Sequence, residues 1–203
     1  MSEFWSEEIT GKSYEKLFEL KKELDFVLIG GWAVYLHTKA FKSKDIDIVV
    51  GYEQLFKLKE NYSLTKNDFL KKYEIKLEHF DVDIYTQNFS ELIVPVKVIL
   101  KEFELIEGIK VVKPEILVIL KEQAFLSRKG TIKGKKDALD ITLILLHSNF
   151  ELEKYFKLIK ETKKDYVSLI KEVLKTVTDK DIPYLNIKRQ EFIKKRKQLI
   201  EKL

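Results

Sequence analysis

The stretch of sequence that most constrains the fold spans residues 26–50 and reads FVLIGGWAVYLHTKAFKSKDIDIVV. The apolar run FVLI ends at the glycine pair Gly30-Gly31, and an amphipathic segment follows. A second apolar run then begins behind two aspartates, Asp45 and Asp47, which are separated by one residue. Because a glycine pair readily interrupts a strand, the pattern predicts a strand, a tight turn, a helix and a second strand.

The composition predicts a soluble protein with a substantial core. Of the 203 residues, 45% are hydrophobic and 12% are aromatic, which is untypical of a disordered chain. The apolar runs are too short to span a bilayer, and the N-terminus lacks the basic-then-apolar order of a signal peptide. The absence of cysteine excludes disulfides and thiolate metal sites. We therefore expect an intracellular, cytoplasmic protein that has no membrane partner.

Charged residues are abundant but nearly balanced, with 38 basic and 33 acidic residues and a net charge of +5. So modest an excess permits an anionic partner without requiring one. Residues 188–203, which read KRQEFIKKRKQLIEKL, are strongly basic. This segment is either the solvated face of a helix or a surface that grips RNA or an acidic partner.

Predicted strands fall in the first half of the chain and predicted helices dominate the second. Two further strands are expected at 73–78 and 80–86, a small edge strand at 109–112, and the segment 94–107 fits either helix or strand. This order favours an α+β fold, with a first domain at 1–112 and a helical C-terminal domain at 113–203. The predicted helices span 13–24 with Ser13 as N-cap, 32–39, 52–59, 114–128, 136–147, 151–162, 165–177 and 187–203, with a further helical turn at 68–72.

Four aspartates are placed to share a cation. Asp45 and Asp47 are two residues apart at the start of a strand, so their side chains point to the same face, and Asp81 and Asp83 have the same relation in a later strand. If these strands are neighbours, the carboxylates repel one another unless a cation lies between them. Hard oxygen ligands select Mg²⁺ or Mn²⁺ over zinc. Two such ions, about 4 Å apart, would stabilise the attacking and leaving oxygens of a phosphoryl transfer.

The glycine turn supplies a complementary feature. A strand that ends in Gly30-Gly31 and leads into a helix presents backbone N–H groups and the positive end of a helix dipole, which suit a phosphate. Each feature alone has an ordinary explanation, as a tight turn, a solvated loop end or an exposed sheet face. Together, in this order and spacing, they favour a site in which a triphosphate lies beside metal-binding carboxylates.

The segment LIGGWAV…KSKDIDIVV, followed by the acidic strand FDVDIYT, resembles the polymerase-β-type nucleotidyltransferase superfamily. It is most similar to the small prokaryotic branch that includes AbiE-like toxin nucleotidyltransferases and antibiotic nucleotidyltransferases. The resemblance implies a small mixed β-sheet core flanked by helices. It also implies that Gly30 and Gly31 hold the triphosphate, that Asp45 and Asp47 bind the metal, and that Asp83 completes a catalytic, metal-binding triad.

The resemblance leaves two details open. Asp83 is preferred to Asp81 as the third carboxylate because family strands read apolar-Asp-apolar-apolar, as VDIY does here. That carboxylate helps to deprotonate the attacking hydroxyl in such enzymes. The branch often has Arg-Thr before its paired aspartates, whereas this chain has Lys42 and Ser43, which are expected to contact the nucleotide. Lysine lacks the bidentate fork of arginine.

The resemblance continues into the second half of the chain. The branch often shows a helix with a lysine and a terminal arginine, followed by K-D-x-x-D, and this chain has Lys121, Arg128 and the run KDALD from Lys136. Lys121 and Lys136 are expected to neutralise phosphate charge, and Asp137 to orient a lysine or the nucleotide. The alternative is that Asp137 and Asp140 merely place negative charge in the first turn of a helix.

The resemblance implies a metal-dependent nucleotidyltransferase that moves a nucleoside monophosphate from an NTP, such as ATP, to a hydroxyl-type acceptor and releases pyrophosphate. The acceptor stays open between an RNA or tRNA 3′ end, as for a toxin with a cognate antitoxin, and a small molecule or a protein. Two alternatives remain: a non-catalytic antitoxin or scaffold of the same fold, and an RNA-binding module that works through the basic C-terminus. The sequence does not indicate the oligomeric state.

Overall fold

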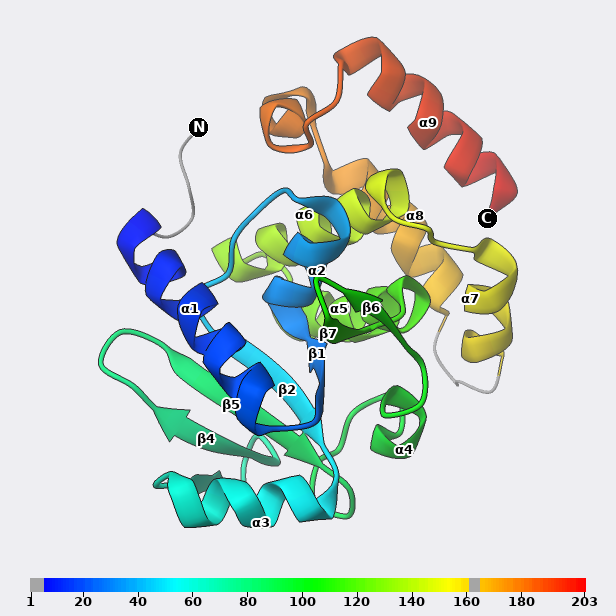
Figure 1. Cartoon of the computed structure of the whole chain (residues 1–203). Helices are drawn as coiled ribbons and strands as arrows, with labels where there is room; N and C mark the ends of the chain where they lie inside the picture. Colours follow the sequence, from blue (N-terminus) through cyan, green and yellow to red (C-terminus); the bar gives the residue numbers. More distant parts are fainter. Residues whose placement is uncertain (1–5, 161–164) are drawn as a thin grey trace. The chain divides into compact units, whose positions relative to one another are not determined.

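The computed structural model describes residues 6–160 and 165–203. They form two compact units, one that runs to Lys113, here called the sheet unit, and one that spans Pro114–Leu203, called the helical unit (Figure 1). The predicted α+β class is confirmed, because every strand of the described residues lies in the sheet unit. None of the helices in the described ranges is long and apolar enough to cross a membrane.

A mixed sheet forms the centre of the sheet unit. The described residues contribute seven strands in the order β3-β4-β5-β2-β1-β7-β6. The pairs β2–β5 and β1–β7 are parallel and the other neighbouring pairs are antiparallel. The strands are β1 (Phe26–Ile29), β2 (Ile46–Val50), β3 (Thr65–Asn67), β4 (Lys72–Lys76), β5 (Asp81–Thr86), β6 (Phe103–Ile106) and β7 (Ile109–Val112).

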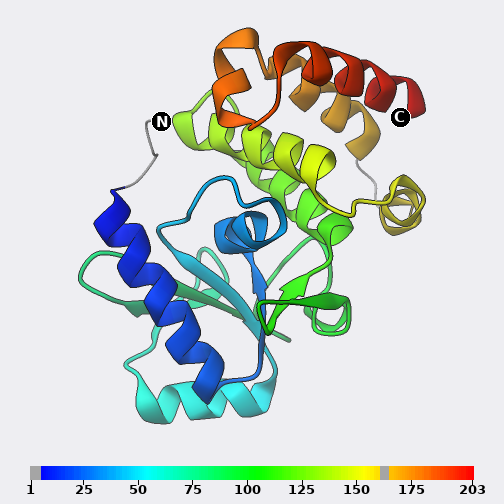
Figure 2. The same cartoon turned by 45° about the horizontal axis from the view of Figure 1, so that its top comes forward.

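Helices of the sheet unit pack on one another as well as on the sheet. The C-terminal end of α1 lies beside α3, where the Tyr62 hydroxyl donates to Glu23 at 2.8 Å (Figure 2). The Trp32 ring nitrogen, in α2, donates to the Ser13 hydroxyl of α1 at 2.9 Å. These helices are α1 (Glu7–Glu23), α2 (Gly30–Thr38), α3 (Tyr52–Asn61) and the single turn α4 (Val96–Ile99).

Alternation along the central strands separates an apolar face of the sheet from a charged one. Val82 and Ile84 of β5 are fully buried, and in the parallel register they lie opposite the equally buried Ile46 and Ile48 of β2. The intervening β5 side chains, two aspartates and a tyrosine, point to the other face and are partly exposed. Successive strand residues face opposite sides of a sheet, so the period-two pattern of the sequence is sufficient to place the carboxylates on one face.

The start of the first helix differs from the prediction. α1 begins at Glu7, where the Ser6 hydroxyl accepts a hydrogen bond from the Ile9 N–H at 3.3 Å. Ser13, predicted as the N-cap, lies fully buried inside the helix and accepts the Trp32 hydrogen bond. The prediction was wrong because the donor that satisfies this serine comes from another helix rather than from its own backbone.

Other boundaries also differ from those predicted. Residues 68–71 form a turn between β3 and β4 instead of a helical turn. β3 was not predicted because its sequence, TKN, has no apolar alternation. The ambiguous segment 94–107 contains α4 and then β6, which pairs with β7. α6 begins at Ile132 rather than at residue 136, because the Thr131 hydroxyl caps it by accepting from the Gly134 N–H at 3.0 Å.

The helical unit is built around α5 and α6. Its interior is largely apolar, with Ile170 and Val173 fully buried, but it also encloses the carboxyl groups of Glu122 and Asp140. The last residues of the helix predicted at 151–162 lie outside the described residues, and the short 3₁₀ segment η1 was not predicted. The elements are α5 (Pro114–Ser127), α6 (Ile132–His147), α7 (Leu152–Ile159), α8 (Tyr166–Thr176), η1 (Asp179–Tyr184) and α9 (Arg189–Lys202).

Candidate functional site

The glycine turn lies directly against one of the predicted metal-binding aspartates. β1 ends at Ile29, whose register partner on β2 is Asp47, and Gly30 then opens α2 with a φ of +70°. A Cβ added to Gly30 would lie 2.6 Å from the Asp47 Cγ, which is far inside van der Waals contact. Glycine is therefore required here for two reasons: the left-handed backbone and the close approach of a carboxylate.

The N-terminus of α2 has the features of an anion-binding turn. The helix has no acidic residue in its first turn, and within the described part of the chain no side chain caps it. Gly31, the second residue of the helix, is buried. The first N–H groups of a helix have no partner within the helix and lie at the positive end of its dipole. This geometry is compatible with the predicted phosphate contact at Gly30 and Gly31.

Strand pairing brings two of the three predicted triad residues side by side. Asp47 of β2 and Asp83 of β5 are register partners in a parallel pair, so their side chains share one face of the sheet. Asp45 lies just before β2, and its Oδ1 accepts a hydrogen bond from the Asp81 backbone N–H at 3.1 Å. Asp81 has the more exposed side chain, at 33% against 13% for Asp83. The geometry thus favours Asp83 over Asp81 as the partner of Asp47.

The residues ahead of the paired aspartates shape the backbone. The Ser43 hydroxyl donates to the Asp45 carbonyl oxygen at 3.2 Å, and Ser43 is buried. Lys42 is exposed. Ser43 therefore helps to position the loop that carries Asp45, and nucleotide contacts by Lys42 and Ser43 stay a prediction.

The neighbouring strand β4 adds cations that the sequence analysis did not single out. The Lys72 ammonium lies 2.5 Å from Asp83 Oδ2 and 3.0 Å from Glu74 Oε1. Lys76 lies 3.0 Å from Glu74 Oε2 and 2.7 Å from Asp81 Oδ2. The period-two run KYEIK in β4 contains the signal, since it places two lysines and a glutamate on one face. Knowing which residues they meet requires the β4–β5 register.

These contacts shift the pKa values of the cluster in opposite directions. Burial raises the pKa of Asp83, and the nearby Glu74 and Asp45 carboxylates act in the same direction, against the opposing effect of Lys72. Burial also acts to raise the pKa of Glu74, but hydrogen bonds from Lys76, Lys72 and Asn67 outweigh it and lower that pKa to about 2. Asp83 therefore binds a proton more readily than Glu74 does.

The donor atoms suit a hard divalent cation only in part. Carboxylate oxygens are the ligands that Mg²⁺ and Mn²⁺ prefer, and Asp83 Oδ1 is buried and accepts no hydrogen bond from the described residues. The other Asp83 oxygen, however, is bound to Lys72. Across residues 6–160 and 165–203, no group of three or more carboxylate, histidine or cysteine side chains is arranged to hold an ion. Asp45 accepts from the Asp81 N–H at 3.1 Å and Asp47 from the Tyr85 hydroxyl at 3.5 Å, so each of the three predicted carboxylates has a partner within the protein.

The second part of the predicted site lies in the helical unit. The ammonium of Lys121 lies 2.7 Å from Asp140 Oδ2, and that of Lys136 lies 3.0 Å from the same atom. Asp137 binds Arg128 at 2.8 Å and lies 3.5 Å from Lys121. The structure thus brings together Lys121, Lys136 and Asp137, which were all predicted, and adds Asp140.

These five residues, Lys121, Arg128, Lys136, Asp137 and Asp140, are called the helical cluster. The pKa values of its two aspartates shift in opposite directions. Burial raises the pKa of Asp137. Burial also acts to raise the pKa of Asp140, but Lys121 and Lys136 outweigh it and hold that pKa below its ordinary value. Asp140 is fully buried, so two ammonium groups compensate one carboxylate that has no access to solvent. The lysines therefore hold this carboxylate in its charged form.

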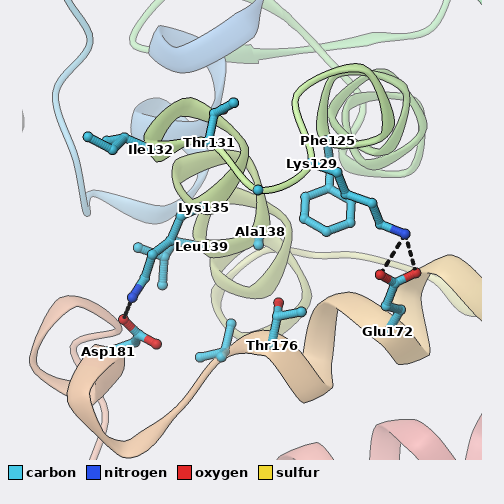
Figure 3. Close-up of a pocket in the computed structure, with 12 residues that line it drawn as sticks. Phe125, Lys129, Thr131, Ile132, Lys135, Ala138, Leu139, Glu172, Thr176 and Asp181 are labelled. Atoms are coloured by element: carbon cyan, nitrogen blue, oxygen red, sulfur yellow. Dashed lines mark hydrogen bonds and ion pairs between the residues drawn. The ribbon is translucent and has the colours of Figure 1, made fainter.

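A separate pocket of about 780 Å³ opens in the helical unit (Figure 3). Phe125, Leu139 and Val177 contribute apolar walls, and none of the predicted site residues lines it. The charged groups along it are already paired: Lys129 binds Glu172 at 2.6 Å, and Lys135 of α6 binds Asp181 of η1 at 2.7 Å. The pocket is distinct from both charged clusters.

Comparisons with known proteins show the fold. No family model matches the sequence, and no curated protein matches it significantly. The crystal structure of an antigenic nucleotidyltransferase-like protein from Paracoccidioides brasiliensis is 16% identical to the chain, covers 95% of it and 93% of its own length, and superimposes with a TM-score of 0.53. That of JHP933 from Helicobacter pylori is 18% identical, with coverages of 98% and 94% and a TM-score of 0.49. The chain has a nucleotidyltransferase-like fold, and its assignment to an AbiE-like branch stays a prediction.

Proposed function

We propose that this protein is a metal-dependent nucleotidyltransferase, which transfers a nucleoside monophosphate from an NTP to a hydroxyl-type acceptor and releases pyrophosphate. The observation that carries the proposal is a row of register partners across the adjacent strands β1, β2 and β5. Ile29, at the glycine turn, pairs with Asp47, and Asp47 pairs with Asp83. The glycine turn and two carboxylates are thereby neighbours although they are far apart in the sequence. The likeness to a nucleotidyltransferase-like protein supports the same class.

Each residue of this row has a role in the proposed reaction. The N–H groups that open α2 at Gly30 and Gly31 bind the phosphate oxygens of the NTP. Asp45 and Asp47 hold Mg²⁺ or Mn²⁺, which when bound neutralises charge on the phosphates. Asp83 accepts the proton of the attacking hydroxyl, whose oxygen then bonds to the α-phosphorus as the bond to the pyrophosphate oxygen breaks. The raised pKa of Asp83 suits it to accept a proton.

The helical cluster supplies further positive charge in this proposal. Lys121, Lys136 and Arg128 carry three positive charges, whereas Asp137 and Asp140 carry two negative ones. The surplus of one positive charge favours binding of a phosphate group, and Asp137 orients Arg128 and Lys121. Nucleotide binding by Lys121, Lys136 and Asp137 is therefore part of the proposal.

An RNA 3′ end, such as that of a tRNA, is the acceptor that charge favours. Residues 188–203 contain seven basic and two acidic residues, so this segment holds as much net positive charge as the whole chain, +5. Part of it is neutralised, since Arg189 binds Asp179 at 2.6 Å and Lys195 binds Glu191 at 3.0 Å. The remaining lysines match the phosphates of a polyanion. A toxin with a cognate antitoxin, acting in the cytoplasm, is the biological role that we propose for such an enzyme.

A non-catalytic member of the same fold is the second candidate. It is favoured by one observation, the pairing of Asp83 with Lys72, which occupies an oxygen that catalysis would use. A non-catalytic scaffold or antitoxin would bind an NTP without transferring any part of it. A pure RNA-binding module would instead bind RNA with an affinity that depends strongly on salt and not on Asp45.

Label transfer tests the proposal directly. The protein is incubated with each NTP labelled at the α-phosphate, with Mg²⁺ or Mn²⁺, and in turn with total RNA, small-molecule extract and protein extract. We expect label in RNA from the wild type and none from the Asp45→Asn/Asp47→Asn double variant. The matched control is Asp68→Asn, which changes an exposed aspartate of the sheet unit. Equal labelling by the double variant would refute the proposal, and label in another extract would replace RNA as the acceptor.

A further inference from the structure

Lys72 is the feature of the site that the proposed reaction leaves unexplained. It begins β4 and is only 11% exposed, and its ammonium binds two carboxylates, Asp83 at 2.5 Å and Glu74 at 3.0 Å. Glu74 and Asp83 are register partners in the antiparallel β4–β5 pair, so their side chains lie on the same face of adjacent strands. Two such carboxylates repel each other strongly when little solvent separates them. The Lys72 ammonium offsets that repulsion.

Lysine ammonium groups bind three of the four carboxylate oxygens of Glu74 and Asp83. Glu74 Oε1 accepts from Lys72 and from Asn67, and Glu74 Oε2 is bound by Lys76. Asp83 Oδ2 is bound by Lys72. Asp83 Oδ1 is the remaining oxygen, and it is buried without a hydrogen-bond partner in the described residues. Lysine therefore occupies positions on Asp83 Oδ2 and on both Glu74 oxygens where a cation would otherwise bind, and it leaves Asp83 Oδ1 without a donor among the described residues.

We propose that Lys72 determines how the carboxylates of this site bind divalent cations: it acts as a resident cation on Asp83, and a metal ion that binds Asp83 must compete with it. The inference rests on the proposed function, because it concerns the same carboxylates. An ion held by Asp45 and Asp47 meets the positive charge of Lys72 two strands away in the sheet, because Lys72 on β4 binds Asp83, the register partner of Asp47. Like charges repel in a partly buried site. Removing the ammonium abolishes that repulsion and also frees Asp83 Oδ2 as a ligand.

The test measures binding of Mn²⁺ alone to the full chain, without nucleotide, by calorimetry and by the electron paramagnetic resonance signal of free Mn²⁺. We expect Lys72→Met to bind Mn²⁺ at least tenfold more tightly than the wild type, and Lys72→Arg, which keeps the charge, to bind it within about twofold of the wild type. The matched control is Lys66→Met on β3, which removes an exposed lysine and is expected to change nothing. Unchanged or weaker binding by a folded Lys72→Met variant, or no detectable binding by either protein, overturns the inference.

A second variant keeps the inference testable if Lys72→Met does not fold. Lys72→Gln, which removes the charge but keeps a polar side chain beside Asp83 and Glu74, is expected to bind Mn²⁺ at least tenfold more tightly than the wild type, whereas Asp45→Asn weakens binding at least tenfold. Unchanged or weaker Mn²⁺ binding by a folded Lys72→Gln variant would overturn the inference. Failure of the proposed function is read from a different result, namely label transfer that does not depend on Asp45 and Asp47.

Discussion

Replacing Glu122 by glutamine should make the protein less sensitive to alkaline pH. Glu122 lies on α5 with no exposed surface, and its carboxyl group accepts hydrogen bonds from the Tyr155 hydroxyl at 3.0 and 3.1 Å. Burial raises the pKa of Glu122 to about 9, although the Tyr155 hydrogen bond acts to lower it. No lysine, arginine or histidine of the described residues forms an ion pair with it. Glu122 is therefore a protonated acid at neutral pH, and glutamine is its nearest neutral substitute.

The magnitude follows from the difference between the folded and unfolded pKa values. The ordinary value of a glutamate is 4.5, so between this pH and about 9 the unfolded chain has lost a proton that the folded chain keeps. The stabilisation is fully present below 4.5 and is lost progressively as the pH rises from there to about 9, by about 1.4 kcal/mol per pH unit. From about pH 5 to about pH 8 the loss is about 4 kcal/mol, an upper bound because water can enter around an ionised Glu122.

Urea unfolding followed by far-ultraviolet circular dichroism measures this difference at a series of pH values. The free energy of unfolding of Glu122→Gln minus that of the wild type should increase by a few kcal/mol from about pH 5 to about pH 8. Other titrating groups contribute equally to both proteins and cancel. Glu153→Gln, which changes an exposed glutamate on α7, should run parallel to the wild type. If Glu122→Gln also runs parallel to the wild type, Glu122 is charged in the folded protein and the reasoning is refuted.

Two further substitutions test the two charged clusters. Gly30→Ala should lower the free energy of unfolding by about 1–3 kcal/mol and abolish label transfer, because alanine is strained at φ +70° and its Cβ displaces Asp47. The control is Gly11→Ala, in α1 with open space around it, which should be neutral or stabilising. Equal urea unfolding curves for the two variants would contradict the argument. Asp140→Asn should cost about 3–5 kcal/mol in the same measurement, because it leaves two largely buried ammonium groups without their shared carboxylate, and a loss below about 1 kcal/mol would show that the lysines find other partners.

The elements that local sequence patterns specify were predictable. The apolar run before Gly30 is β1, the segment after it is α2, and the apolar run that contains Asp47 is β2. Period-two alternation also placed Asp83 on the polar face of β5, because alternation depends on nothing beyond the strand itself. The sequence therefore predicted the glycine turn, two carboxylate-bearing strands and the helical second half. Whether the two strands are neighbours was an assumption, and the parallel β2–β5 register supports it.

The features that escaped prediction depend on residues distant in the sequence. Ser13 looked like a helix cap because serine often is one, but the Trp32 ring nitrogen satisfies it inside α1. The contact between Lys72 and Asp83 depends on the register of the β4–β5 pair, which no local pattern fixes. The KDALD run indicates at most that Asp140 places charge near the start of a helix, and its pairing with Lys121 requires α5 and α6 to pack together.

The position of Lys72 changes what the paired aspartates alone imply about chemistry. A glycine turn followed by Asp45 and Asp47 indicates cation binding by two residues, but the availability of the third carboxylate is decided on a different strand. β4 alternates lysine and glutamate on the face that meets Asp83, and this alternation stabilises the sheet because each carboxylate has a cationic neighbour. The same contacts lower the tendency of Asp83 to bind a metal ion. Chains that share the glycine turn and the paired aspartates should therefore differ in metal affinity according to the charge on the strand beside the third carboxylate, and Mn²⁺ titration of Lys72→Met measures that dependence within one protein.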